Sequence, residues 1–173
     1  MIHEIRIAPH PALREVAEPV ETVDDEILTL LDDMAETMYD APGIGLAATQ
    51  IGIAKRLVVI DLSGGREGEA AKLYKMINPE VIEASEETVI QEEGCLSLPA
   101  QYADVERPAT VTVRYTDENG ETQEVKGDGL MSACLQHEID HLDGKLFIDY
   151  ISSLRRRLIM KSLKKHLREQ SRR

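Results

Sequence analysis

The sequence His137-Glu138-Ile139-Asp140-His141 lies inside a segment, Leu130 to Leu142, that reads as a helix terminated at Gly144. On an α-helix, two imidazoles four residues apart project from one face, about 40° round and about 6 Å along the axis from each other. Two rings in this arrangement are close enough to bind a single divalent metal ion. Glu138 points to the side of the pair, where it can take a proton from a water at the metal. This spacing is typical of hydrolytic metal sites.

Two histidines leave the metal short of a ligand, and the chain has two thiols to offer, Cys95 and Cys134. Cys134 lies on the correct side of the helix, but seven residues separate it from His141. Their separation is about 10.5 Å of helical rise, which is too far for both to bind one tetrahedral ion. We therefore interpret Cys134 as a small apolar residue that lines a pocket over this face. Cys95 is the better thiolate, because its turn-rich segment, Glu93 to Pro99, can fold against the helix.

Length and composition narrow the class of protein. A chain of 173 residues is the size of one domain and can bury a core without disulfides. No apolar run approaches the roughly 18 residues of a membrane span, so we expect no membrane association. The N-terminal residues have neither the layout of a signal peptide nor that of a transit peptide. With only two cysteines, reduced thiols are favoured over a disulfide, and we expect a cytoplasmic protein.

The net charge of −12 is unevenly distributed. Residues 154–173 contain nine Lys or Arg and one acid, so this tail carries about +8 and the rest of the chain about −20. A basic block of this kind favours binding to an acidic partner, RNA included. The alternative, on composition alone, is a solvated helix face with favourable positive charge at its C-terminal end.

The remaining elements are outlined by apolar spacing and turn residues. An N-cap pattern at Thr22 to Asp25 opens a helix that Pro42 ends. Expected strands cover residues 56–62, 74–77 and 81–90, and Asn119-Gly120 predicts a hairpin between 110–115 and 122–125. A short extended piece at 147–151 precedes a last helix capped by Ser152 or Ser153. Strands gathered before helices indicate an α+β domain, with antiparallel sheets packed around the central metal-binding helix and a C-terminal helix.

Three segments together resemble a known family. Residues Gly43 to Gln50, Glu93 to Leu98 and Gln136 to Gly144 look like the three signature motifs of peptide deformylases, which remove the formyl group from N-terminal formylmethionine. A two-histidine helix alone is only moderately specific, whereas all three motifs in this order are highly specific. The similarity runs along the whole chain, including the stretch Ile7 to Arg14.

The resemblance implies a role for each motif residue. Cys95, His137 and His141 are implied as ligands of one catalytic metal, commonly Fe(II) in the family, with Zn(II), Ni(II) or Co(II) also accepted. A Cys/His/His set suits several of these ions by ligand softness. Glu138 is implied as general base and acid. The Gln50 side chain and the Leu96 backbone N–H are implied as donors that stabilise the oxyanion.

The substrate is expected to bind beside the metal. Candidates for the apolar slot that takes the methionine side chain are Ile44, Leu130 and Cys134, although each could equally be plain core. The backbone around Gly45 is expected to pair with the bound peptide as an extra strand. The resemblance also matches Glu93 and Arg107 to a pair that braces the cysteine loop. Tyr102 stands where many family members carry an arginine or another polar residue, and we interpret it as a surface aromatic.

Two other functions are considered for this sequence. A general metallopeptidase would need a further ligand downstream, where the only histidine is His166 in the basic tail. A non-enzymatic, metal-stabilised module that binds RNA through that tail would need neither Glu138 nor Gln50, and their presence argues against it.

The resemblance to bacterial deformylases implies a function for the basic tail, because the substrate of these enzymes emerges from the ribosome. We expect residues 1–153 to form a single catalytic domain. Residues 154–173 are expected to form a basic helix that docks near the exit tunnel of the ribosome. The residues expected to pack this helix on the domain are Leu154, Leu158, Ile159, Ser162 and Leu163.

Overall fold

The computed structural model describes residues Met1 to Arg173. Five strands form an antiparallel sheet in the order β1-β2-β3-β6-β7, and β4 pairs with β5 in a second antiparallel sheet. The strands are β1 Gly45–Ala47, β2 Leu57–Ile60, β3 Tyr74–Ala84, β4 Thr88–Cys95, β5 Leu98–Pro108, β6 Thr110–Thr116 and β7 Thr122–Asp128. The α-helices are α1 Asp25–Asp40, α2 Gly129–Leu142 and α3 Ser153–Ser171, and the 3-10 helices are η1 Pro11–Arg14, η2 Ala48–Ile51 and η3 Phe147–Tyr150.

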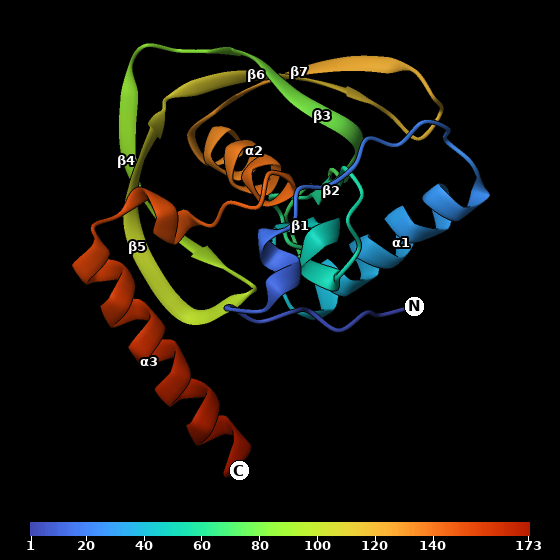
Figure 1. Cartoon of the computed structure of the whole chain (residues 1–173). Coiled ribbons are helices and arrows are strands. Elements are labelled where there is room, and N and C mark those ends of the chain that lie inside the picture. Colours follow the sequence, from blue (N-terminus) through green and yellow to red (C-terminus); the bar gives the residue numbers. More distant parts are fainter.

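Helix α2 lies at the centre of the molecule, with the strands of both sheets curving around it and α1 on the far side of β1 and β2 (Figure 1). Its buried side chains, among them Leu135, Ile139 and Leu142, pack with Val58, Met76 and Val113 of the large sheet in one apolar cluster. A central helix covered on several sides keeps water from its metal-binding face. The predicted α+β architecture with antiparallel sheets around this helix is confirmed.

Local sequence explains how the second sheet is built. Along β5 the buried residues Gln101, Ala103, Val105 and Arg107 alternate with exposed ones, the period-two pattern of a strand with one face toward the core. Opposite it, β4 runs antiparallel, and a two-residue turn joins Cys95 to Leu98. The tight hairpin therefore delivers Cys95 to the end of a strand that faces α2.

Helix boundaries follow from capping. The Asp24 side chain accepts a hydrogen bond from the Ile27 N–H at 2.9 Å, so Asp24 is the N-cap of α1, two residues later than the pattern at Thr22 suggested. Of the two predicted caps for the last helix, Ser152 is correct, since its Oγ accepts from Arg155 N. Gly144 follows α2 with φ +73°, a conformation that favours glycine and ends the helix as expected.

Two predicted elements were wrong. The strand expected at residues 81–90 is interrupted, because β3 ends at Ala84 and β4 begins at Thr88, so that the chain turns at residues 85–87. The piece expected to be extended at 147–151 is the 3-10 helix η3, in which Asp149 Oδ2 accepts from the Leu146 N–H at 3.0 Å. In both cases short-range side-chain hydrogen bonds favour a turn, and the alternating pattern of a strand does not reveal such bonds.

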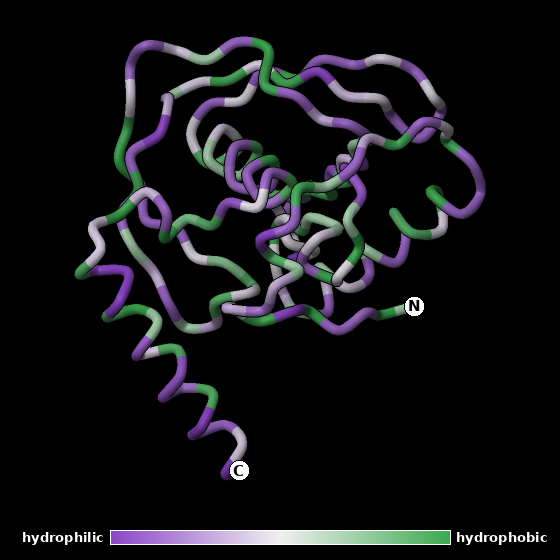
Figure 2. The backbone as a smooth tube through the Cα atoms, viewed as in Figure 1, coloured by the Kyte–Doolittle hydropathy of each residue, from purple (hydrophilic) through white to green (hydrophobic).

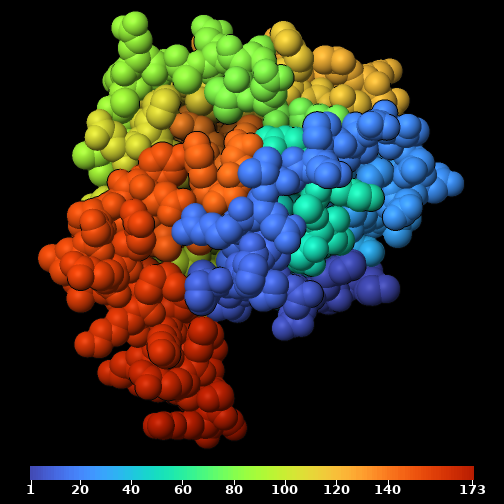
Figure 3. All heavy atoms as spheres, viewed as in Figure 1, coloured from blue at the N-terminus to red at the C-terminus, as the bar shows by residue number.

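Helix α3 projects from the body of the molecule (Figures 1 and 3). Ile159 and Leu163 are buried in a cluster with residues of β5 and η3, and they attach the helix to the domain. Leu154 and Leu158, which were expected to dock, are 60% and 54% exposed, because they lie on the opposite side of the helix from Ile159 and Leu163. Hydrophilic and hydrophobic residues alternate along α3 (Figure 2).

Candidate metal centre and active site

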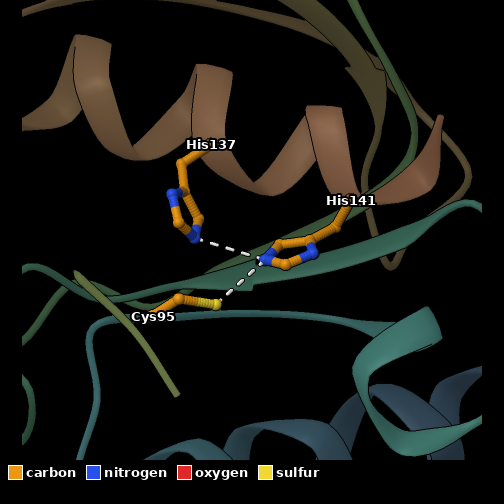
Figure 4. Close-up of side chains that lie close together, drawn as sticks. All are labelled: Cys95, His137 and His141. Carbon is orange, nitrogen blue, oxygen red and sulfur yellow. Dashed lines mark hydrogen bonds between the residues drawn. The ribbon is translucent and has the colours of Figure 1, made fainter. Parts of the chain in front are cut away.

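Three potential metal ligands converge at the centre of the fold. His137 and His141 extend from α2 toward Cys95 at the end of β4 (Figure 4). Their donor atoms all lie within 4.8 Å of one another, with Nε2 of His141 at 3.2 Å from Nε2 of His137 and 3.3 Å from Sγ of Cys95. Cys134 is not a member of this group, as its helical offset from His141 predicted.

The geometry of this donor set fits a metal ion. Ligand atoms about 2.0–2.3 Å from a tetrahedral ion lie about 3.3–3.8 Å from one another, close to the separations found here. His141 is fully buried and His137 nearly so, and their Nε2 atoms face each other at 3.2 Å, a separation that a shared metal ion explains. Cys95, His137 and His141 can therefore hold one metal ion.

A chain of buried charges orients His137. Glu93 Oε1 lies 3.0 Å from Nδ1 of His137, and because a carboxylate only accepts, this nitrogen carries the proton and leaves Nε2 free to bind a metal. Arg107 donates from Nε and Nη2 to Glu93 at 2.5 and 2.9 Å and from Nη1 to Asp140 at 2.9 Å. Tyr150 completes the chain through its hydroxyl, 2.7 Å from Asp140 Oδ2. The predicted pairing of Glu93 with Arg107 is confirmed.

The electrostatics of this network of side chains keep both Glu93 and Arg107 charged. Burial alone would raise the pKa of the Glu93 carboxyl, but the hydrogen bonds from His137 and Arg107 hold it below its usual value. Burial would likewise lower the pKa of Arg107, and Glu93 and Asp140 raise it instead. The pair is thus an ionic clamp, with both side chains at most 7% exposed.

Glu138 occupies a different environment from Glu93. Its side chain is buried, and Oε1 has no hydrogen-bond partner. Burial raises the pKa of the Glu138 carboxyl to about 7. A carboxyl that exchanges its proton near neutral pH is well matched to general acid and base chemistry.

Two N–H donors lie beside Cys95, the side-chain amide of Gln50 and the backbone N–H of Leu96. Gln50 is buried, and its Oε1 accepts from the Ala47 N–H at 2.9 Å, which fixes the amide so that Nε2 faces Ser97 Oγ at 3.2 Å and Cys95 Sγ at 3.6 Å. The Leu96 N–H lies in the turn between β4 and β5 and donates to no backbone acceptor. The Leu96 N–H is thus without a backbone partner, and Gln50 Nε2 is held next to the thiol by its contacts with Ser97 and Cys95.

A cavity of about 550 Å³ joins these groups. Ten residues were predicted from the sequence to be catalytic, metal-binding or substrate-binding. Nine of them line this cavity, and the tenth, His141, is buried behind them. The lining members are Ile44, Gly45, Gln50, Cys95, Leu96, Leu130, Cys134, His137 and Glu138. A Cβ on Gly45 would collide with Glu138 Oε2 and meet Cys134 Sγ at 3.0 Å, so glycine allows the backbone of β1 to approach the carboxylate. Leu130 is 53% exposed, which places it at the mouth of the cavity and not deep within it.

The sequence reasoning missed some participants. Asp140 and Tyr150 were not expected in the ion-pair chain, although Asp140 lies three residues after His137 and therefore on the same helix face. Tyr102 was interpreted as a surface aromatic, and it is 60% exposed, but it also lines the cavity with Glu92. For Tyr102 and Glu92 the available signal is strand alternation next to Cys95, which places every second side chain on one face.

A Cys/His/His set that can hold a metal ion, next to a buried carboxylate and two N–H donors at the wall of one cavity, is the arrangement of a metal-dependent hydrolase. Comparison with known proteins then identifies the family of hydrolases to which the chain belongs. Residues 2–157 match the family described as polypeptide deformylase. The chain is 56% identical over 164 residues to a peptide deformylase of Rhizobium meliloti, covering 95% of this chain and 93% of the relative. It is 54% identical over 165 residues to one of Phenylobacterium zucineum, covering 95% and 96%.

Solved structures of peptide deformylases have the same fold as this chain. A peptide deformylase from Legionella pneumophila superposes with a TM-score of 0.93 at 44% identity, covering 100% of this chain and 99% of that one. A peptide deformylase from Ehrlichia chaffeensis, solved in complex with actinonin, gives a TM-score of 0.89 at 40% identity, covering 95% and 97%. The chain belongs to the polypeptide deformylase family, whose enzymes hydrolyse the formyl amide of N-terminal formylmethionine and release formate. None of its helices combines the length and the apolar character needed to cross a bilayer.

Proposed function

We propose that this chain deformylates nascent polypeptides with one divalent metal held by Cys95, His137 and His141. The proposed native metal is Fe(II), and Zn(II), Ni(II) or Co(II) can replace it. The convergence of these three donors with Glu138 and Gln50 on one cavity is the observation that carries the proposal. When bound, the metal supplies Lewis-acid chemistry that makes water nucleophilic near neutral pH. The thiolate and two imidazoles suit any of these ions by ligand softness.

Glu138 acts as the general base and acid. Its buried carboxyl accepts a proton from the attacking water and delivers it to the amine that leaves as methionine loses its formyl group. The unpartnered Oε1 and a pKa of about 7 support this role, because the group can both take up and release a proton at neutral pH.

Gln50 and Leu96 stabilise the charge that develops on the formyl oxygen. The amide orientation imposed by Ala47 presents Nε2 of Gln50, and the turn at Leu96 presents a backbone N–H. Preorganised donors of this kind need no rearrangement during the reaction, and the loss of one typically costs about 2.7–4 kcal/mol of transition-state stabilisation.

The methionine side chain occupies the apolar part of the cavity. Ile44, Cys134 and, at the mouth, Leu130 form its walls. The backbone at Gly45 pairs with the substrate main chain, which accommodates different downstream sequences because main-chain hydrogen bonds do not depend on side chains. The closeness of Gly45 to Glu138 supports this path, since a strand along β1 would pass directly in front of the base.

We predict that anaerobically purified protein releases formate from a formyl-Met peptide and removes no residue from the same peptide without the formyl group. A formate assay and mass spectrometry of the products measure the two reactions, and elemental analysis of the same sample identifies the metal. Cleavage of the unblocked peptide at a comparable rate would instead establish a general metallopeptidase.

For the basic helix we propose that residues 1–153 form the catalytic domain and that residues 154–173 dock the enzyme on the ribosome near the exit tunnel, in the cytoplasm. The +8 charge of this segment and its projection from a body of opposite charge support the proposal. Ile159 and Leu163 attach the helix to the domain and leave its arginines and lysines free for phosphates.

We predict that truncation after Ile151 weakens binding to ribosomes by about tenfold or more at low salt, because it removes most of the positive charge available for phosphates. Cosedimentation at several salt concentrations measures the effect, and the full-length chain should show the steeper salt dependence. A truncated chain that binds ribosomes as tightly as the full-length chain would refute the docking role.

A further inference from the structure

Thr49 lies next to Gln50 in η2, and its hydroxyl links this segment to the helix α2. Oγ1 of Thr49 donates a hydrogen bond to the backbone carbonyl of His141 at 3.2 Å, across 92 positions of the sequence. The residue is only 1% exposed. Threonine hydroxyls commonly bond to a carbonyl of their own segment, but this one bonds to a distant helix. Thr49 therefore connects the segment of a proposed oxyanion donor to a proposed metal ligand.

The carbonyl that Thr49 contacts belongs to the last turn of α2. The final four carbonyls of a helix have no partner within the helix, so contacts from other segments set the position of this turn. His141 O also accepts from the Gly144 N–H at 3.1 Å, and Leu142 O accepts from Arg56 Nη1 at 3.1 Å. Among these partners, Thr49 alone is adjacent in sequence to a group that is proposed to act on the substrate.

Apolar packing does not make the same link. The buried apolar residues of η2, Ala48 and Ile51, belong to a cluster formed with α1 and β2. The buried apolar residues of α2, among them Leu135 and Ile139, belong to a different cluster. The bond from Thr49 is the only hydrogen bond between η2 and α2. The relative position of the two segments therefore depends strongly on one hydroxyl group.

Gln50 is held by several other contacts, but none of them reaches α2. Its Oε1 accepts from the Ala47 N–H at 2.9 Å, and its backbone carbonyl accepts from the Arg6 N–H at 2.7 Å. Its Nε2 lies 3.2 Å from Ser97 Oγ. These contacts fix the amide relative to β1, the N-terminal segment and the turn after β4. The hydrogen bond from Thr49 fixes the same segment relative to α2.

We propose that Thr49 is a positioning residue for deformylation: its hydroxyl holds the last turn of α2 against η2 and so sets the distance between the His141 imidazole and the Gln50 amide. The inference rests on the proposed function and adds a residue to it. Thr49 does not line the cavity, so it acts through its neighbours and not on the substrate. An oxyanion donor is effective only at the correct place, and a displacement of about 1 Å can cost about 10²-fold in rate.

Two substitutions separate the hydroxyl from the shape of the side chain. Thr49→Val replaces the hydroxyl by a methyl group, whereas Thr49→Ser keeps the hydroxyl. We expect the valine variant to lose about tenfold in kcat for a formyl-Met peptide, because a small displacement of the amide weakens stabilisation of the transition state. KM should stay within about twofold, since interactions made only in the transition state affect kcat. The serine variant should keep kcat within about twofold of the wild-type value.

Thr37→Val is the matched control. Thr37 is also 1% exposed, and its Oγ1 donates to the backbone carbonyl of Asp33 at 2.7 Å, within α1 and away from the cavity. The same hydroxyl accepts from the His3 N–H at 3.0 Å, so this variant loses at least as many hydrogen bonds as Thr49→Val. It should lower the denaturant midpoint of unfolding at least as much and leave kcat unchanged. An equal loss of kcat in both variants would reduce the role of Thr49 to general stability.

A double-mutant cycle tests whether Thr49 acts through Gln50. In a Gln50→Ala background there is no amide left to position, so adding Thr49→Val should lower kcat by less than about twofold. A further loss of about tenfold in that background would show that the hydroxyl acts on another group, and the proposal would be wrong.

Hydrogen exchange of the metal-free protein measures the link between η2 and α2 without any assay of activity. Thr49→Val should speed the exchange of backbone amides in η2 and in the last turn of α2 by about fivefold, the effect of losing one typical hydrogen bond, while α1 is unchanged. Unchanged exchange in the last turn would refute the link. Absence of formate release from the wild-type protein would reject the proposed function, whereas a wild-type kcat in Thr49→Val would reject only the positioning role.

Discussion

Replacing Glu138 by alanine is expected to abolish formate release while the metal stays bound. The carboxyl is buried in the cavity wall and its Oε1 has no hydrogen-bond partner, so no hydrogen-bonded neighbour can take over its proton transfer. General acid and base groups contribute about 10²–10⁴-fold to rate, and we expect a loss of at least this size in kcat. Cys95, His137 and His141 do not depend on Glu138 for their orientation, since Glu93 holds His137. Formate assays and elemental analysis of the same preparation provide the measurement.

A second substitution separates proton transfer from cavity shape. Glu138→Gln keeps the volume of the side chain and removes its charge, and it should lose as much activity as alanine. It should not lower the free energy of unfolding, because a buried carboxylate without a partner opposes folding at pH 7. Activity and stability are then expected to move independently, as is typical of groups retained for function. A glutamine variant with near-normal turnover would contradict the assignment of the base.

The convergence of the proposed metal ligands was predictable because helix geometry constrains two of them so strongly. A spacing of four residues places His137 and His141 on one face, and a spacing of seven excludes Cys134 from the same ion. Cys95 required more than spacing, since nothing local places a residue 42 positions upstream against the helix. The motif resemblance supplied that placement, and the hairpin β4–β5 explains it physically, with the turn after Cys95 folding the strand end toward α2.

Other features depend on contacts between distant segments that no local pattern records. Tyr150 reaches Asp140 only because η3 turns back under α2, and the sequence suggested an extended piece there. Leu154 and Leu158 satisfy helical spacing as well as Ile159 and Leu163 do. Which pair is buried is decided by the angle at which α3 leaves η3, and that angle is a property of the packed domain. Local periodicity thus identifies an amphipathic helix without fixing the direction of its docked face.

Removing the positive partner of the buried ion pair should have the largest effect on stability. Arg107→Met leaves Glu93 in the interior with one remaining partner, His137, and we expect a loss of about 3–5 kcal/mol in the free energy of unfolding. Denaturant titration measures this loss. Arg114→Met is the matched control, because Arg114 pairs with Glu124 in the large sheet with both side chains 52% exposed. Such surface pairs typically contribute about 0–1 kcal/mol.

The same substitution should weaken metal binding, and this second effect distinguishes a clamp for His137 from simple structural support. Without Arg107, Glu93 is no longer fixed opposite Nδ1 of His137, and the loss of such outer partners typically lowers metal affinity about 10–100-fold. The double variant Glu93→Gln/Arg107→Met removes both charges of the buried pair and should recover part of the stability, because Glu93 is no longer left as a buried carboxylate without its cation. The recovery is only partial because Asp140 also loses Arg107 and keeps the Tyr150 hydroxyl as its partner. It should not recover the affinity, since a neutral amide holds the imidazole less strongly than a carboxylate. If metal affinity returned together with stability, the pair would be acting only on the fold, and His137 would be oriented by its packing against Phe147.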